Sequence, residues 1–217
     1  MFYFDEYKGH RVLRSDLIKK ANVFFTTRNF DKNILANYIH PNQTHSDNVE
    51  IVDNRVDYPQ TDGLIVAKND VGIYLKFADC TPLIFYDEIN NIGAISHAGW
   101  RGTVEKIGVK TVIKMNKIFN SKPENIIALI GPAISICCYE VGEDVKNILL
   151  KTVKNNKDLF IDNKVDLKKI NARQLEEIGI EKIDICPYCT SCNNDLFFSY
   201  RKENGTTNRH YAVLRLN

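Results

Sequence analysis

The sequence has no long uninterrupted run of apolar residues and no large excess of charge of one sign. Of its 217 residues, 29 are Lys or Arg and 27 are Asp or Glu, which leaves a formal net charge of +2. No window approaches the ~20 apolar residues that a membrane span needs. The basic residues are spread along the chain and form no patch typical of nucleic-acid binding. We therefore expect neither a membrane nor a nucleic acid as a partner.

A secretory leader and a linker between domains are also missing from the pattern. Residues 1–16 mix charges with apolar side chains, which is unlike a signal peptide. No internal repeat, low-complexity tract or Pro/Gly-rich stretch divides the sequence. We expect residues 1–217 to form a single domain in the cytoplasm, as a monomer or small homo-oligomer.

The six cysteines are distributed unevenly, which argues against a disulfide framework. Cys80 stands alone, Cys137 and Cys138 are adjacent, and Cys186, Cys189 and Cys192 share the run CPYCTSC. A chain of this length can bury a core without covalent staples, and the reducing cytosol keeps thiols reduced. We expect all six to be free thiols.

Apolar patterning predicts strands and helices that alternate only in part. Strands are predicted over 73–77, 83–86, 91–97, 126–130, 182–186, 195–201 and 209–217, with a break at 78–82 because Pro82 disfavours regular pairing. Helices are predicted over 104–118 and 139–153, and from about Asp166 to a C-terminal cap at Gly179. The pattern predicts an α/β (α+β) fold, a single compact domain with mixed β-sheets flanked by helices.

Three irregular segments carry side chains that bind metals. QTHSDNV contains His45, ADCTP contains Cys80, and SHAGWRG contains His97. Two imidazoles and one thiolate form a three-ligand set of the kind that catalytic zinc uses while it keeps a fourth position for water. Taken singly, each residue is more often a hydrogen-bonded histidine or a small buried cysteine than a functional side chain. Asp79, beside Cys80, could orient a neighbouring imidazole.

These motifs resemble the YfiH-like family. QTHSDNV, DGLIVAKNDVGIYLKFADCTPLIFYD, ISHAGWRG, IGPAI..CCYEVG and CT....LFFSYR occur in that family's order, from about Phe25 to the end of the chain. The family was long labelled multicopper polyphenol oxidase, or laccase domain, and is now described as purine nucleoside phosphorylase. The resemblance implies a compact α/β fold and one metal ion per chain, zinc by preference, held by His45, Cys80 and His97.

The same resemblance implies an activity and a set of site residues. The implied reactions are phosphorolysis of adenosine, inosine, guanosine and methylthioadenosine, and deamination of adenosine as a second activity, with purine nucleosides and phosphate as partners. The predicted catalytic residues are His45, Asp79, Cys80 and His97, and the predicted substrate- or phosphate-binding residues are Arg28, Arg101 and Arg201, which match the family's arginines. Arg101 is also a reasonable phosphate ligand by its own chemistry, and Asp79 is a candidate proton shuttle.

The sequence departs from the family pattern around the expected substrate rim. The glycine-rich loop that normally follows TTR is absent, since TTRNFDKN runs almost directly into QTHS. Ser46 and Asn208 stand where glycines are usual. These departures leave the three metal ligands intact but affect the region expected to select the nucleoside.

Three other functions use the same residues or the remaining cysteines. A copper oxidase would also use two histidines and a cysteine, but the chain has only five histidines and two methionines. Copper remains a possible alternative occupant of the site. A metal-free hydrolase would use Cys80 as nucleophile with His45 or His97 as base. A binding module would hold a structural zinc on Cys186, Cys189 and Cys192, with Cys137 or Cys138 as fourth ligand.

Overall fold

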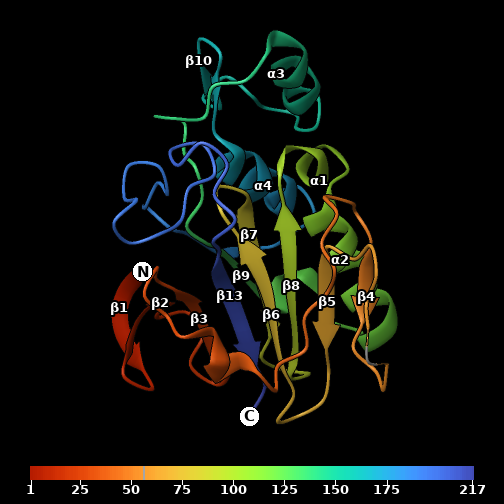
Figure 1. Cartoon of the computed structure of the whole chain (residues 1–217). Helices are drawn as coiled ribbons and strands as arrows, with labels where there is room; N and C mark the ends of the chain where they lie inside the picture. Colours follow the sequence, from red (N-terminus) through yellow and green to blue (C-terminus); the bar gives the residue numbers. More distant parts are fainter. Residues whose placement is uncertain (56) are drawn as a thin grey trace.

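The computed structural model describes residues 1–55 and 57–217, and in them most strands belong to two sheets (Figure 1). The first, the N-terminal sheet, is antiparallel and has the order β1-β2-β3-β13-β6. The second, the central sheet, has the order β12-β9-β7-β8-β5-β4. Its outer pairs, β12 with β9 and β4 with β5, are parallel, while the inner pairs are antiparallel. The central sheet is thus mixed, as predicted, while the N-terminal sheet is purely antiparallel.

The bounds of the elements are as follows. The N-terminal sheet consists of β1 (Phe2–Tyr7), β2 (His10–Ser15), β3 (Asn22–Thr26), β13 (His210–Arg215) and β6 (Gly72–Phe77). The central sheet consists of β12 (Lys182–Ile185), β9 (Ile126–Ile130), β7 (Thr81–Asp87), β8 (Ile92–Ala98), β5 (Gly63–Val66) and β4 (Val49–Ile51). The α-helices are α1 (Trp100–Val104), α2 (Ile107–Phe119), α3 (Glu143–Leu150) and α4 (Leu167–Glu176). Short elements are η1 (Lys32–Leu35), η2 (Pro123–Asn125) and the hairpin of β10 (Phe160–Ile161) and β11 (Lys164–Val165).

The two sheets and the helices form three layers. Side chains of the N-terminal sheet, such as Phe25 and Leu75, share one apolar core with central-sheet residues such as Ile84 and Ile95. The opposite face of the central sheet packs against α2 and α4 in a second core. Both faces of the central sheet are therefore covered, which explains why β7, β8 and β9 are buried along their whole length and consist mostly of apolar residues. Among the described residues no helix is both long enough and apolar enough to cross a membrane.

Several predicted elements are confirmed. The alternation in 73–77 forms β6, and the apolar runs at 126–130 and 182–186 form the neighbouring strands β9 and β12. The helix predicted from Asp166 is α4, whose first turn is capped because the Asp166 side chain accepts from the Lys169 N–H. Its end is the predicted glycine cap: Gly179 has a φ of +93°, and the Ile180 N–H donates to the Leu175 carbonyl.

Four predictions about secondary structure are wrong in their limits or type. The predicted break at 78–82 is shorter than expected, because β7 already begins at Thr81 and Pro82 pairs with His97 near the end of the strand. The predicted helix 104–118 is interrupted by Lys106, whose φ of 56° lies in the left-handed region. The predicted helix 139–153 is limited to α3, Glu143–Leu150.

The fourth wrong prediction is the strand over 195–201, which the structure replaces by turns. Its N–H groups make local hydrogen bonds, since Leu196 and Phe197 both donate to the Asn193 carbonyl. Phe197 and Phe198 are nevertheless buried. The apolar run therefore predicted burial correctly but not strand structure, because the backbone here makes hydrogen bonds within turns and not with a neighbouring strand.

Antiparallel pairing of β7 with β8 brings two of the predicted ligands to one edge of the central sheet. Cys80 immediately precedes β7, and His97 is the penultimate residue of β8, paired with Pro82. Side chains alternate between faces along a strand, so His97 points to the same side as Ile95, toward the N-terminal sheet. Its ring lies 5.3 Å from that of Phe77 at the end of β6.

Candidate active site at the edge of the central sheet

The three predicted metal ligands lie together. One ligand atom each from His45, Cys80 and His97 falls within 4.8 Å of the others, so the group could hold a metal ion. We call these residues the His-Cys-His cluster. His97 is buried, Cys80 is half-buried and His45 is exposed, so the cluster is closed on the protein side and open on the other. Three protein ligands with an open side are typical of a catalytic metal site.

A fully buried carboxylate that the sequence analysis missed organises the cluster. Asp62 Oδ1 lies 2.8 Å from His97 Nδ1 and accepts from the His45 N–H at 3.1 Å. Asp62 Oδ2 accepts from the N–H groups of Thr44 and Ser46 and from the Ser46 hydroxyl. One carboxylate therefore orients the His97 ring, leaves its Nε2 for a metal, and fixes the loop that carries His45.

Backbone conformation also positions the ligands. His45 has a φ of 61°, in the left-handed region that side chains with a Cβ adopt at a cost of about 1–2 kcal/mol. The hydrogen bonds from its segment to Asp62 offset that cost. Gly99, after β8, is close to the cluster: a Cβ there would lie 3.0 Å from Cys80 Sγ and 3.4 Å from His45 Cδ2. The glycine of the SHAGWRG motif thus leaves room for the two ligands.

Electrostatics at the cluster favour the ionised thiol. Burial raises the pKa of Cys80, but the neighbouring His97 and His45 imidazoles outweigh burial and lower this pKa to about 6. Burial lowers the pKa of His97, but Cys80 and the Asp62 carboxylate together raise it to about 9. Burial likewise raises the pKa of Asp62, and its contacts with His97 and the loop lower it to about 2. Without a metal, Cys80 is therefore a thiolate paired with a protonated His97 at neutral pH, and a metal bound at the cluster would displace the proton from His97 Nε2.

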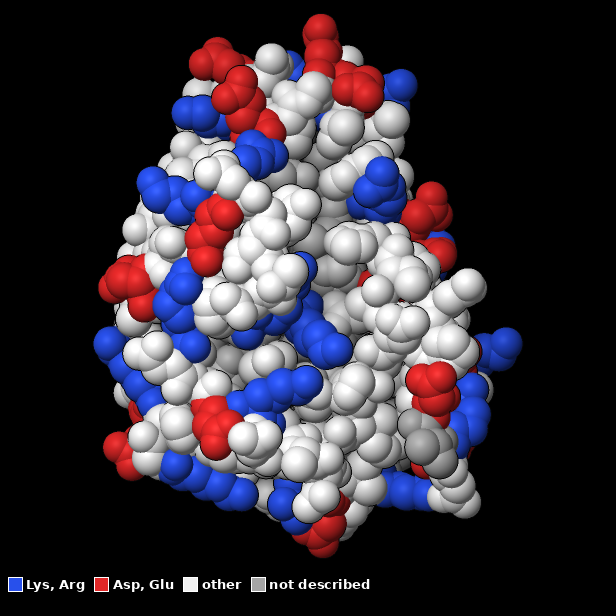
Figure 2. All heavy atoms as spheres, viewed as in Figure 1, with Lys and Arg blue, Asp and Glu red and all other residues white. Residues whose placement is uncertain are grey.

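The His-Cys-His cluster opens into a cavity of about 540 Å³, within the usual range for small-molecule sites. Ile134, Tyr139 and Tyr200 form part of its wall, and Lys76, Arg201 and Arg209 bring positive charge to it. Figure 2 shows Lys and Arg side chains gathered beside a hollow, near the middle of the face of the molecule that the figure presents. The cavity thus combines a metal-capable corner, aromatic surface and cations.

The three predicted arginines occupy different places. Arg201 lines the cavity, and its guanidinium donates two hydrogen bonds to the Glu140 carbonyl. Arg101 lies in an adjoining cleft that His45 and Cys80 also line, with its guanidinium over the Trp100 ring. Arg28 does not line the cavity: it pairs with Glu203 at 2.6 Å and donates to the Asn194 carbonyl. The structure therefore brings two of the three to the His-Cys-His cluster.

Asp79 lies beside the cluster but its carboxylate is already engaged. One oxygen accepts from the Thr190 hydroxyl and the other from the Arg201 N–H, both at 2.7 Å. Asp79 also has a φ of 82°, so the turn before Cys80 is strained. These contacts favour a positioning role, while proton transfer by Asp79 stays a prediction.

Lys76 and Arg209 were missed because nothing in their local sequence marks them. Lys76 follows the alternation of β6, and Arg209 directly precedes β13, the strand beside it. The pKa of Lys76 is lowered by burial and by the nearby charges of Lys32 and Arg209. Among the described residues Lys76 has no carboxylate partner within 4 Å. Close cations without a carboxylate between them form a site for an anion.

A second group of side chains could also bind a metal. It consists of Cys137, Cys138, Cys189 and Cys192, whose Sγ atoms lie within 4.8 Å of one another. We call it the four-cysteine cluster. The predicted set that included Cys186 is wrong, because Cys186 is fully buried in the core between the sheets. The described cysteines are all free thiols, as expected.

Comparison with known proteins identifies the family. A family model described as multi-copper polyphenol oxidoreductase laccase matches residues 19–217. The chain belongs to this family, the YfiH-like family that its motifs resemble.

Individual relatives carry a different name from the family model. The chain is 32% identical over 218 residues to the purine nucleoside phosphorylase YlmD of Bacillus subtilis, covering 92% of this chain and 77% of the relative. It is 32% identical over 174 residues to a purine nucleoside phosphorylase of Clostridium acetobutylicum, covering 79% and 74%. The crystal structure of YlmD from Geobacillus stearothermophilus superposes with a TM-score of 0.90 at 26% identity, covering 99% of this chain and 98% of that one. The predicted fold class is therefore confirmed.

Proposed function

We propose that this chain is a zinc-dependent purine nucleoside phosphorylase. The observation that carries the proposal is the position of the His-Cys-His cluster at one side of a cavity whose other walls carry aromatic rings and unpaired positive charge. The names of the Bacillus subtilis and Clostridium acetobutylicum relatives support the reaction class. Phosphorolysis needs this combination, because a phosphate anion and a flat heterocyclic base must be held on either side of the bond that breaks.

In this proposal His45, Cys80 and His97 hold one zinc ion. The donor set fits, since one ionised thiolate and two imidazoles match the ligands that zinc accepts in catalytic sites. Copper is the alternative occupant, because the same ligands bind it more tightly than zinc. When bound, the metal would supply Lewis-acid polarisation of a substrate atom. The chain's own part is to hold the His97 ring through Asp62 and to keep Cys80 ionised.

The phosphate would be held by the cations of the cavity. Lys76 lies on β6, Arg209 immediately precedes the neighbouring strand β13, and Arg201 lines the same cavity. Their positive charges attract an anion and align it with the anomeric carbon before any bond changes. Arg101, in the adjoining cleft, stays a second candidate for this role. Arg28 would act through the Glu203 contact, not on the substrate.

The nucleoside base would lie against the aromatic wall. Tyr139 and Tyr200 offer ring faces, and Ile134 offers an aliphatic surface. Burial, with a smaller contribution from the Cys80 charge, raises the pKa of Tyr139 to about 12. Its hydroxyl therefore stays protonated and can donate a hydrogen bond to a purine nitrogen as that nitrogen gains negative charge. We propose adenosine, inosine, guanosine and methylthioadenosine as substrates, with adenosine deamination as a second activity of the same cavity.

The copper-oxidase alternative is disfavoured by the positions of the histidines. A blue-copper site with a trinuclear cluster needs many more imidazoles than this chain offers. Of the five histidines, the described structure groups only His45 and His97 as metal ligands. His210 is instead buried between the Phe77 and Phe197 rings.

The metal-free hydrolase alternative shares its residues with the proposed phosphorylase, so an experiment must separate them. Purified protein is incubated with inosine, with and without inorganic phosphate, and hypoxanthine and ribose 1-phosphate are measured. The proposal expects products only with phosphate, and loss of both in Cys80→Ala. Phosphate-independent release of base, with protein that contains no metal and a Cys80 that iodoacetamide alkylates, would establish the hydrolase instead. Adenosine as substrate separates deamination, which forms inosine, from phosphorolysis, which forms adenine.

A further inference from the structure

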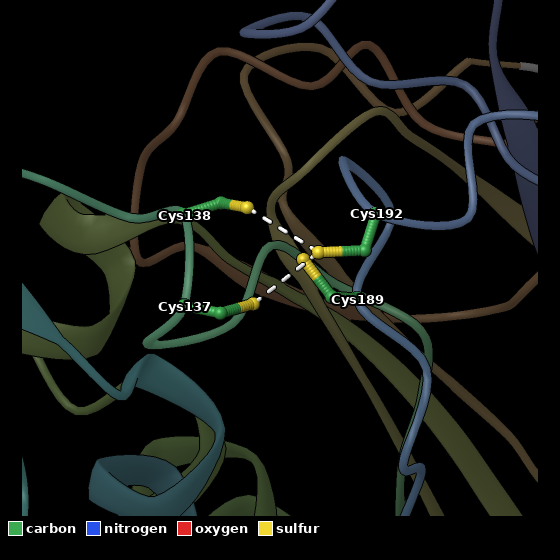
Figure 3. Close-up of side chains that lie close together, drawn as sticks. All are labelled: Cys137, Cys138, Cys189 and Cys192. Carbon is green, nitrogen blue, oxygen red and sulfur yellow. Dashed lines mark hydrogen bonds between the residues drawn. The ribbon is translucent and has the colours of Figure 1, made fainter.

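Two neighbouring strands of the central sheet lead into the four-cysteine cluster. β9 and β12 are parallel, with Ile130 opposite Ile185, so the segments that follow the two strands leave the sheet at the same edge. A bridge between Ala133 and Cys189 continues the pairing beyond the strands. Cys137 and Cys138 follow β9, while Cys189 and Cys192 follow β12. Figure 3 shows the four sulfur atoms facing one another from these two segments.

The spacing of the sulfur atoms matches that around a single tetrahedral ion. Zinc–sulfur bonds of about 2.3 Å place the sulfurs of a tetrahedral site about 3.8 Å apart. Here Cys192 Sγ lies 3.4 Å from Cys138 Sγ and 3.5 Å from Cys137 Sγ, and all pairs are within 4.8 Å. A disulfide requires about 2.05 Å between sulfurs. The cluster therefore fits one ion shared by four thiolates better than a covalent pair.

The donor set specifies the kind of ion and its role. Four thiolates with no imidazole or carboxylate select soft or borderline metals, and a tetrahedral set of four is the arrangement of structural zinc. The Cys189–Cys192 pair has the two-residue spacing common in such sites. The Ser135 N–H also donates to Cys189 Sγ at 3.4 Å, which stabilises negative charge on that sulfur. With all four positions filled by protein, no site remains for substrate.

The two segments joined by the cluster also form one wall of the active-site cavity. The segment after β9 carries Ile134 and Tyr139, and the segment after β12 leads to Tyr200 and Arg201. Outside the cluster they are tied by the Ala133–Cys189 bridge, with its hydrogen bond from the Thr190 N–H to the Ala133 carbonyl, and by the two hydrogen bonds from Arg201 to the Glu140 carbonyl. The described backbone between 131 and 142 and between 187 and 203 consists of turns, bends and isolated bridges, not strands or helices. An ion at this point would cross-link segments that little regular structure holds.

We propose that Cys137, Cys138, Cys189 and Cys192 bind a second, structural zinc ion that fixes this wall of the cavity. The site shares no ligand with the His-Cys-His cluster. Its contribution to catalysis rests on the proposed phosphorylase activity, but zinc binding itself does not.

The test counts zinc in protein purified under reducing conditions without added metal. We expect two zinc ions per chain in wild type, one in Cys80→Ala, one in Cys137→Ser/Cys192→Ser and none in the triple variant. Cys186→Ala is the matched control, because Cys186 belongs to the same CPYCTSC run but lies in the core; it should keep two. Cys80→Ala protein with no metal would overturn the proposal, as would iron, or a disulfide at Cys192, in place of zinc.

A spectroscopic readout does not depend on activity or on the folding of the double variant. In Cys80→Ala loaded with Co²⁺, the expected spectrum is that of a tetrahedral ion with four thiolate ligands, including strong sulfur-to-cobalt charge transfer. Four cysteines should react with a thiol reagent only after a chelator removes the metal. Four thiols that react equally fast before and after chelation would contradict the proposal.

The kinetic consequence separates this proposal from the proposed function. We expect Cys137→Ser/Cys192→Ser to show a KM for inosine raised about 5- to 10-fold with kcat changed less than twofold, since the wall is loosened but the His-Cys-His cluster is kept. Unchanged KM in a variant that has lost one zinc would refute the role in fixing the wall. Two zinc ions in a protein without phosphorolysis would refute the proposed function and leave the zinc site standing.

Discussion

The two clusters differ in how the fold holds them and in what they leave open. The His-Cys-His cluster is built on the ends of β7 and β8 and oriented by the buried carboxylate of Asp62. Its exposed member, His45, faces a cavity. The four-cysteine cluster lies between turns, has no carboxylate partner among the described contacts, and has four ligands of one kind. An open site oriented by a rigid sheet suits catalysis, while a closed set of thiolates suits cross-linking.

The largest expected effect comes from removing the Cys80 thiolate of the His-Cys-His cluster, which we also call the open cluster because one side of it faces the cavity. Cys80→Ala should lower kcat/KM for inosine phosphorolysis by roughly 10³-fold or more, equal to about 4 kcal/mol of transition-state stabilisation. The four-cysteine cluster should keep its metal in this variant. Steady-state kinetics with zinc analysis on the same sample checks both statements. Activity within tenfold of wild type would show that the open cluster is not the catalytic centre.

The next effect concerns the carboxylate that only the open cluster has. Asp62→Asn removes the charge that fixes the His97 tautomer, so zinc affinity at the open cluster should fall about 10- to 100-fold. Asp87→Asn is the matched control, because Asp87 is equally buried at the other end of β7 but binds turn N–H groups. Competition with a zinc chelator measures the zinc affinity of both variants. Equal weakening in the two variants would mean that general destabilisation, not ligand orientation, is responsible.

A smaller effect tests the cations that line the cavity beside the open cluster. Lys76→Met should raise KM for phosphate about 10-fold, or about 1.4 kcal/mol, with kcat changed much less. Arg28→Met is the control, because Arg28 lies outside the cavity and should leave KM for phosphate unchanged. Initial rates over a series of phosphate concentrations give KM for phosphate in both variants. The reverse result would place the phosphate near Arg28, as the family resemblance implies.

The smallest expected effect comes from a histidine that belongs to neither cluster. Burial lowers the pKa of His210 to about 3, only partly opposed by the Pro132 carbonyl, so the folded state keeps this ring neutral while the unfolded chain protonates it below about 6.5. Its stabilising contribution is complete above pH 6.5 and is lost as pH falls toward 3. Wild type should lose roughly 0.7 kcal/mol more than His210→Leu between pH 7 and pH 6. Urea unfolding at the two pH values measures this difference. Identical losses of stability in wild type and His210→Leu would mean that His210 does not cause the acid sensitivity.

The sequence was informative where local pattern and tertiary role coincide. The apolar run 126–130, the alternation in 73–77 and the Asp166 cap each predicted an element correctly. The three residues of the His-Cys-His cluster were also predicted to lie together, because each lies in a motif next to a strand. The helix break at Lys106 and the turns at 195–201 were not predicted, because apolar spacing does not encode such turns.

Residues that act across long sequence distances could not be predicted in the same way. Asp62 gains its importance from a hydrogen bond to His97, 35 positions away, and nothing in TDGLIV marks a buried carboxylate. Cys186 was grouped with Cys189 and Cys192 by proximity in sequence. The structure separates them because the Cys186 N–H still bonds to the Ile130 carbonyl, which holds Cys186 at the sheet, while the chain turns away afterwards.

The most direct test of this account compares two variants that each keep one zinc ion. Cys80→Ala and Cys137→Ser/Cys192→Ser are assayed at equal zinc content for phosphate-dependent release of hypoxanthine from inosine. We expect Cys80→Ala to be inactive and Cys137→Ser/Cys192→Ser to retain most of its kcat. If Cys80→Ala were active and the double variant inactive, the four-cysteine cluster would be the catalytic site and the proposed role of the His-Cys-His cluster would be wrong.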